Sequence, residues 1–222
     1  MEGISQQVKY DSNKWELLKS KREKAISVLE SLRKIGVEGY VYGSVARGDV
    51  NQHSDIDVVV LSPNLVALDS IDGDHKFIIK ATPLSTIKGY ISLDPQESTV
   101  ISFPLGKLKA EELEFYRFGG IVSSTELKSG VRVPGVNKDL RLIIPTLEGH
   151  IELEVIGNEA LVSRMLNISI QTVQQRVYLL SKRRVSRRSG VFFKYSMGID
   201  ETFSHALSNL QKSKGIWRDL VD

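Results

Sequence analysis

Two short segments in the first third of the chain carry the most structural information: YGSVARG at residues 42–48 and SDIDVVV at residues 54–60. In the second segment one residue separates two aspartates, so in an extended strand both carboxylates point to the same face. Two such anions side by side repel each other unless cations lie between them. Carboxylate oxygens suit Mg²⁺, and a pair of divalent ions about 3.5–4 Å apart is the usual arrangement where phosphates are handled. The pattern therefore predicts that Asp55 and Asp57 hold two Mg²⁺ ions, with Mn²⁺ as an alternative.

The first segment has the features of a phosphate-binding turn. Gly43 and Ser44 stand where a short apolar run ends and a helix-like stretch begins. Glycine lets the backbone approach a phosphate, and the free N–H groups of a helix start, together with the Ser44 hydroxyl, can bind its oxygens. Arg47, one helical turn further on, can add positive charge for the same phosphates. We therefore expect a phosphate-binding site beside the two carboxylates.

Taken together, the two segments resemble the signature of the polymerase-β-type nucleotidyltransferase superfamily. That signature has an apolar residue, Gly-Ser, a short spacer, and Asp-apolar-Asp followed by an apolar strand; here ten residues separate Ser44 from Asp55. The resemblance implies that Asp55 and Asp57 are catalytic and bind two metals. It also implies that Gly43, Ser44 and Arg47 bind the phosphates of a nucleoside triphosphate. The implied reaction is in-line attack of an acceptor hydroxyl on the α-phosphate, with pyrophosphate leaving.

Members of this superfamily have a third carboxylate on a later strand beside the pair, often the base that takes the proton of the acceptor. The sequence offers four residues for this role, all in or next to β-like runs. Asp94, at the end of one run, is the first choice, and Asp139, before another, is the second. Glu152 and Glu154, which alternate in a third run, come next. We therefore predict Asp94 as the third catalytic residue and keep the other three as alternatives.

The segments around the two motifs predict a mixed α+β domain with a small mixed sheet over residues 1–156. Helices are expected at residues 13–35, where apolar residues recur three or four apart, and at residues 108–118. Strands are expected at residues 55–61, 76–82, 90–93, 99–105, 140–145 and 151–156. Strands and helices mixed in this order favour an α+β domain with a mixed sheet.

After Gly157 the pattern becomes that of a helix-turn-helix followed by a wing. Helices are expected at residues 159–166 and 170–184, and a β-hairpin wing at residues 185–195. A closing helix is expected at residues 202–220. The pattern resembles a winged helix-turn-helix domain, so we expect a second, DNA-binding domain over residues 157–222. Together, the two halves look like archaeal nucleotidyltransferases that carry such a module at the C-terminal end.

Positive charge is concentrated in this rear part. From Gly157 onward there are 11 Lys or Arg and 5 Asp or Glu, against 19 and 22 before it, within a net charge of +3. A basic surface favours a polyanionic partner, and glutamine side chains can read base edges. We therefore predict DNA or RNA as a partner, bound by Gln171, Gln175, Arg176, Lys182, Arg183, Arg184, Arg187 and Arg188.

Composition narrows the class of protein further. The chain has no cysteine, which excludes disulfides, thiolate zinc sites and cysteine nucleophiles and fits a cytoplasmic location. Its apolar runs are too short to span a membrane. The sequence thus predicts a Mg²⁺-dependent nucleotidyltransferase that moves a nucleoside monophosphate from a nucleoside triphosphate such as ATP to an acceptor hydroxyl. The alternatives are a DNA-binding transcriptional regulator whose front domain only senses nucleotide, and a nucleotidyltransferase that modifies proteins.

Overall fold

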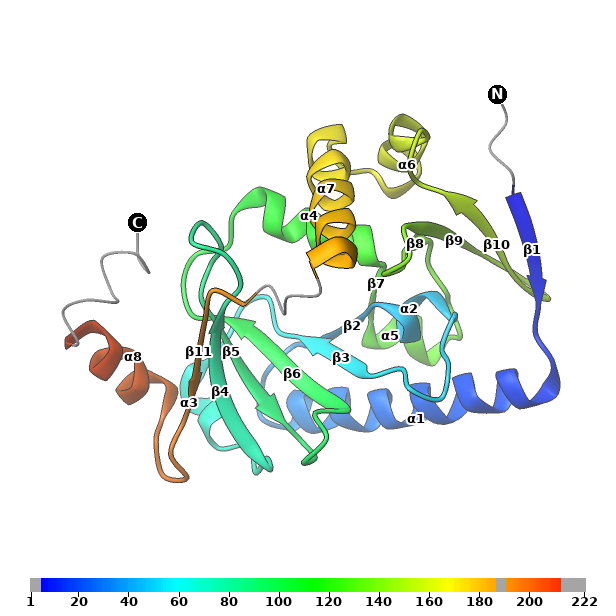
Figure 1. Ribbon diagram of the computed structural model, residues 1–222. Helices are drawn as coiled ribbons and strands as arrows, with labels where there is room; N and C mark the ends of the chain where they lie inside the picture. Colours follow the sequence, from blue (N-terminus) through cyan, green and yellow to red (C-terminus); the bar gives the residue numbers. More distant parts are fainter. Residues whose placement is uncertain (1–4, 187–190, 213–222) are drawn as a thin grey trace.

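The computed structural model describes residues 5–186 and 191–212 of the chain (Figure 1). Its largest element is a seven-stranded sheet in which only β3 and β6 pair in parallel. In spatial order the strands are β11 (Phe193–Ser196), β4 (His75–Lys80), β5 (Lys88–Ser92), β6 (Thr99–Pro104), β3 (Ile56–Val59), β2 (Tyr40–Tyr42) and β7 (Ile121–Ser123). The mixed sheet and its helices confirm the predicted α+β class.

One face of this sheet is covered by α1 (Ser12–Lys34), which runs along it in Figure 1. The helix begins at Asp11, whose side chain accepts a hydrogen bond from the backbone N–H of Lys14. Its buried residues Leu18, Ala25, Leu29 and Leu32 recur at helical spacing and share a hydrophobic core with Val58 of β3. Because successive strand residues point to opposite faces, the residue before Val58, which is Asp57, points away from α1.

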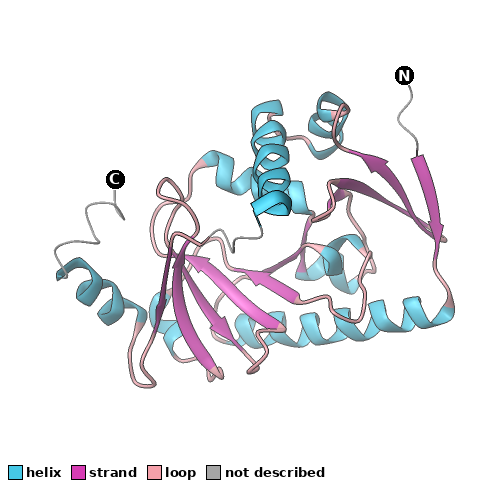
Figure 2. Ribbon diagram, in the orientation of Figure 1, coloured by secondary structure: helices cyan, strands magenta, loops and turns pink. Residues whose placement is uncertain are grey.

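A second, four-stranded antiparallel sheet has the order β1 (Ser5–Lys9), β10 (Gly149–Glu154), β9 (Arg141–Thr146) and β8 (Gly135–Val136). Three helices, α4 (Ala110–Gly119), α6 (Glu159–Leu166) and α7 (Ile170–Ser186), lie on the opposite side of the molecule from α1 (Figure 2). Phe118 of α4, Val162 of α6 and Val173 of α7 share a core with Leu142 and Leu153 of this sheet. The two predicted rear helices therefore pack on strands of the predicted front domain.

The prediction of a hairpin wing is wrong for the residues that the structure describes. Residues 185 and 186, expected as its first arm, still belong to α7, and the second arm is β11, which pairs with β4. The predicted turn of the wing, residues 187–190, lies outside the described residues. The unpaired backbone groups at the edge of β4 offer a partner for β11, and sequence periodicity cannot distinguish this pairing from a local hairpin.

The last described helix, α8 (Phe203–Lys212), also joins the large sheet. The ring of Phe203 is fully buried and packs edge-on against Phe103 of β6, with ring centroids 4.8 Å apart. Phe203, Ala206 and Leu210 belong to the core under the large sheet. Both hydrophobic cores thus contain residues from both sides of the predicted boundary at residues 156 and 157.

Three short helices complete the described chain: α2 (Ser44–Arg47), α3 (Leu65–Asp69) and α5 (Ser124–Lys128). Of these, α2 is the short helix that was expected to follow the predicted phosphate-binding turn. Across residues 5–186 and 191–212, no helix combines the length and the apolar character that crossing a lipid bilayer requires.

Candidate active site

A cleft of about 520 Å³ lies where the two sheets meet, and it collects both halves of the predicted motif. Its wall includes Gly43, Ser44 and Arg47 of the β2–α2 segment together with Asp55 and Asp57 at the start of β3. Further parts of the wall come from β1, α1, the α2–β3 loop, the end of α4, the β8–β9 turn, β10 and α7. The predicted nucleotide-binding and metal-binding residues therefore share one hollow.

The β2–α2 turn depends on a glycine. Gly43 has φ +82° and ψ −146°, a conformation that L side chains rarely adopt. Its backbone N–H donates to the carbonyl of Gly120, 2.9 Å away, which fixes the turn against the end of α4. A Cβ atom added at Gly43 would lie 3.6 Å from Oδ2 of Asp57. The turn and this carboxylate are thus immediate neighbours, with Ser44 opening α2 beside them.

Asp57 lies in an environment that penalises its negative charge. Burial and the nearby charge of Asp55 raise the pKa of Asp57 from its usual 3.8 to about 6, against the opposing effects of Lys138 and Arg47. Asp57 is partly buried, whereas Asp55 is exposed. The excess of negative charge beside the β2–α2 turn favours a cation, and carboxylate oxygens are donors that fit Mg²⁺.

In the described ranges no set of three or more histidine, aspartate or glutamate side chains is arranged to hold an ion. Mg²⁺ commonly binds through one or two carboxylates and completes its shell with water and substrate phosphates. Asp55 and Asp57 therefore fit a magnesium site that is completed by a bound triphosphate.

The structure does not bring Asp94 to this cleft. Asp94 follows β5, and its carboxylate accepts backbone hydrogen bonds from Gln96, Ser98 and Thr99 and one from the hydroxyl of Ser98. The two strands beside β3 are β6, whose paired residues 99–102 are Thr, Val, Ile and Ser, and β2, which is Tyr-Val-Tyr. The first choice for the third carboxylate thus lies in a turn, and neither neighbouring strand of β3 carries a carboxylate.

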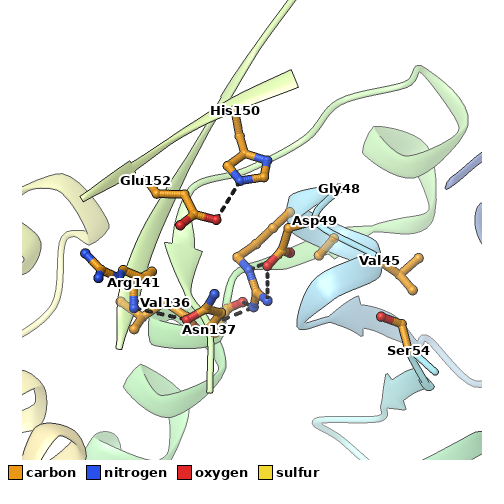
Figure 3. Close-up of polar contacts among 12 residues, drawn as sticks. Val45, Gly48, Asp49, Ser54, Val136, Asn137, Arg141, His150 and Glu152 are labelled. Carbon is orange, nitrogen blue, oxygen red and sulfur yellow. Dashed lines mark hydrogen bonds and ion pairs between the residues drawn. The ribbon is translucent and has the colours of Figure 1, made fainter. Parts of the chain in front are cut away.

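Two of the alternatives do line the cleft. Asp139 reaches it from the exposed β8–β9 turn, and Glu152 reaches it from β10. Oε1 of Glu152 lies 3.0 Å from Nε2 of the buried His150 (Figure 3). Glu154, two residues further along β10, is exposed and is not part of the cleft wall. The second sheet therefore supplies the additional carboxylates.

Arg47 is held by protein groups. Its guanidinium donates to both carboxylate oxygens of Asp49 at 3.0 Å, and Nη1 donates to the carbonyls of Gly119 at 2.6 Å and Val136 at 3.4 Å (Figure 3). The side chains of Arg47 and Asp49 are only 6% and 11% exposed. These contacts join α2 to the end of α4 and to β8, so Arg47 supports the fold of the cleft, a role that the phosphate-binding prediction did not include.

Two other cations line the cleft. Lys138, in the β8–β9 turn, is close enough to Asp57 to lower its pKa. The guanidinium of Arg176, on α7, lies 5.2 Å from the ring centre of Phe115 and 5.7 Å from that of Phe118. No motif marks Lys138 in the sequence, so it was not predicted, although it adjoins the candidate Asp139.

The remaining predicted nucleic-acid-binding residues lie apart from Arg176. Gln171, Gln175 and Lys182 are exposed on α7. The side chains of Arg183 and Arg184, and all of Arg187 and Arg188, lie outside the described residues. The structure thus brings one member of this predicted group, Arg176, into the cleft.

The first turn of α7 is docked on α4. Ser169, just before the helix, donates from its hydroxyl to Glu114 at 2.6 Å and from its backbone N–H at 3.1 Å, and the hydroxyl of Thr172 also donates to Glu114. In helix-turn-helix proteins the corresponding start of the second helix contacts base edges. Here the carboxylate of Glu114 accepts the hydrogen bonds at the start of α7, so this part of the helix contacts α4.

Comparison with protein families agrees with the geometry of the cleft. Residues 22–94 match the family model described as "Nucleotidyltransferase domain", a segment that contains the β2–α2 turn, Asp55 and Asp57. This segment is thus similar to a nucleotidyltransferase domain, and the mixed α+β fold is consistent with it. No curated protein and no solved structure gives a significant match. The β8–β9 turn, β10 and α7 lie beyond the matched segment.

Proposed function

We propose that this protein is a Mg²⁺-dependent nucleotidyltransferase, which moves a nucleoside monophosphate from a nucleoside triphosphate to an acceptor hydroxyl and releases pyrophosphate. The observation that supports it best is the contact between the two motif halves. Gly43 of the turn lies against Oδ2 of Asp57 in a cleft large enough for a nucleotide. Both residues fall in the segment that matches the nucleotidyltransferase domain model.

The four motif residues of the cleft each have a role in this proposal. Asp55 and Asp57 would hold two Mg²⁺ ions, or Mn²⁺ ions in their place, which when bound would neutralise the triphosphate and activate the acceptor hydroxyl. Ser44 would bind the outer phosphates through its hydroxyl and backbone N–H, and Gly43, whose own N–H donates to Gly120, would let the backbone approach them. The protein contributes mainly positioning and charge stabilisation, as in other phosphoryl-group transfers.

The experiment that tests the proposal is incubation of the full chain with each α-³²P-labelled nucleoside triphosphate, MgCl₂ or MnCl₂, and cell extract. We expect label to appear on an acceptor, with pyrophosphate released, only when the divalent ion is present. Calorimetry with each of the four magnesium triphosphates is run in parallel. Failure of all four to bind would contradict the proposal.

Lys138 and Arg176 are the cations that we expect to bind the triphosphate in place of Arg47. A hydrogen bond to a charged group contributes about 1.5–3 kcal/mol, so Lys138→Ala and Arg176→Ala should each weaken Mg-ATP binding about tenfold or more in calorimetry. The matched control is Arg164→Ala, which removes an exposed arginine of α6 outside the cleft wall and should leave the dissociation constant unchanged. Equal affinity of all three variants and the parent would contradict the assignment.

We propose nucleic acid as the acceptor or partner, because Gln171, Gln175 and Lys182 remain exposed on α7. The regulator alternative relied in part on a winged helix-turn-helix, and β11 pairs with β4 where the second arm of the wing was expected. Binding of single-stranded RNA and of duplex DNA at several salt concentrations tests this partner, because phosphate contacts make affinity fall steeply with salt. Affinity that does not change with salt would contradict it.

A further inference from the structure

Two neighbouring cations of α1, Lys21 and Arg22, contact the two halves of the motif from outside the cleft wall. Nζ of Lys21 donates to the carbonyl oxygen of Ser54 at 2.6 Å. The guanidinium of Arg22 donates to the carbonyls of Val45 and Ala46 in α2, at 3.2 and 3.1 Å. Adjacent residues of a helix point about 100° apart, so one helical turn can reach two separate segments. The helix α1 is thus tied both to the β2–α2 turn and to the segment before β3.

Arg22 fixes α2 on α1. The residue is 8% exposed, and its Nη2 also donates to the carbonyl of Val131 at 2.8 Å. Burial and the nearby charge of Arg132 lower the pKa of Arg22 to about 10, so the guanidinium stays charged at neutral pH. Its charge lies at the carbonyl end of α2, where a cation stabilises a helix. The β2–α2 turn therefore has a fixed position relative to α1.

The loop between α2 and β3 ends in a compact turn over residues 51–54. The backbone N–H of Ser54 donates to the carbonyl of Asn51 at 3.0 Å, and the N–H of Asn51 donates to Oγ of Ser54 at 2.9 Å. The side chain of Asn51 accepts a bond from the N–H of His53 at 2.8 Å. Because these bonds close within the turn, they set its shape but not its place in the molecule. The bond from Lys21 ties the turn to α1.

The position of Asp55 depends on its backbone. Within residues 5–186 and 191–212, its exposed carboxylate forms no hydrogen bond or ion pair. On one side, Lys21 holds the preceding carbonyl, and on the other, the N–H of Ile56 donates to the carbonyl of Ser98 at 2.8 Å. Two neighbouring carboxylates repel each other, so without a cation Asp55 is pushed away from Asp57. The two backbone anchors oppose this displacement.

We propose that Lys21 is a positioning residue of the transfer reaction, which holds the start of β3 at the distance from the β2–α2 turn that a metal-bound triphosphate requires. The proposal rests on the proposed function. Lys21 acts through the backbone of Ser54 and does not touch the substrate, because it lies outside the cleft wall. It also lies one residue before the segment that matches the family model, so the family comparison does not assign it a role.

The test measures nucleotide binding and turnover of the full chain in Lys21→Met, which removes the donor and keeps an apolar side chain. The probe is the manganese complex of α,β-methylene-ATP, an analogue that cannot be cleaved between its α- and β-phosphates. Its affinity by calorimetry should fall about tenfold or more, because groups that orient metal ligands typically contribute 10–100-fold. Turnover of α-³²P-labelled ATP should fall as well and recover in part at higher MgCl₂. Lys21→Arg keeps a donor for the Ser54 carbonyl and should restore most of the affinity.

Urea unfolding in EDTA separates this role from a contribution to the fold. Lys21 is only partly buried, and the Ser54 carbonyl can bond to water in its absence, so the midpoint of Lys21→Met should stay close to that of the parent. The matched control is Lys24→Met, which removes an exposed lysine of the same helix and should change neither affinity, turnover nor midpoint.

The outcomes distinguish this proposal from the proposed function. If Lys21→Met keeps parental affinity and turnover while Asp57→Asn loses both, the role of Lys21 is overturned and the transferase function stands. If Lys21→Met lowers the urea midpoint but leaves the affinity of the folded protein unchanged, Lys21 serves the fold alone and the proposal is also wrong. A parent that does not bind the manganese analogue contradicts both.

Discussion

Asp57→Asn will abolish metal-dependent transfer and will stabilise the metal-free protein. The buried position of Asp57 and the neighbouring Asp55 raise its folded-state pKa to about 6. The folded state therefore binds this proton more tightly than the unfolded state does. The contribution of Asp57 to the free energy of unfolding is therefore highest below about pH 4 and falls as the pH rises from about 4 to about 6. Two pKa units correspond to about 3 kcal/mol, and partial exposure of the side chain makes about 1–3 kcal/mol the expected gain for asparagine at pH 8.

Urea unfolding in EDTA at pH 4, 6 and 8 measures this effect, with the gain from Asp57→Asn near zero at pH 4 and largest at pH 8. Asp72→Asn, at an exposed position outside the cleft wall, is the matched control and should change stability at none of these pH values. With Mg-ATP at about 100 times its dissociation constant, the parent should gain about 2.7 kcal/mol and Asp57→Asn should gain far less. Loss of stability in Asp57→Asn at pH 8, or Mg-ATP affinity equal to that of the parent, would contradict the metal-binding role.

The part of the site that the sequence predicted is the part built from local structure. Gly43 directly follows β2 and Ser44 opens α2, while Asp55 directly precedes β3 and Asp57 lies in it. The strands β2 and β3 pair so that Tyr42 faces Asp57. Because a short segment contains all the elements, residue spacing alone places the side chains on a common face. The residues of this motif accordingly meet in one cleft.

The rest of the site depends on pairings between distant parts of the chain, which periodicity does not reveal. Glu152 lines the cleft from β10, a strand of the second sheet that pairs with β1 near the start of the chain. Asp94 was predicted for the third carboxylate because it ends a β-like run, but β6 lies between β5 and β3, and backbone N–H groups of its turn bind the Asp94 carboxylate. A strand end is visible in the sequence, whereas the order of strands in a sheet is not.

Arg47→Leu should destabilise the protein by about 3–5 kcal/mol, because it leaves Asp49 as an uncompensated charge in a buried site. The guanidinium also satisfies the carbonyl of Gly119 at 2.6 Å, so the variant leaves a further acceptor without its donor. Guanidinium chloride unfolding measures the loss. Total stabilities of about 5–15 kcal/mol are typical, so most of the folded population should survive at low temperature.

A double-mutant comparison separates this structural role from direct phosphate binding. Replacing both members of the ion pair, Arg47→Leu with Asp49→Leu, removes the stranded charge and should recover part of the lost stability, because apolar replacements of buried pairs are often tolerated. Arg47→Lys keeps a positive charge but cannot form the two parallel bonds to Asp49, so it should be destabilised as well, though less than Arg47→Leu. If Arg47 served mainly as a phosphate ligand, Arg47→Leu would keep its stability within about 1 kcal/mol of the parent and lose only Mg-ATP affinity. Because its donors are turned to Asp49, Gly119 and Val136, we expect the opposite order: the fold weakens first, and nucleotide binding is lost only as a consequence.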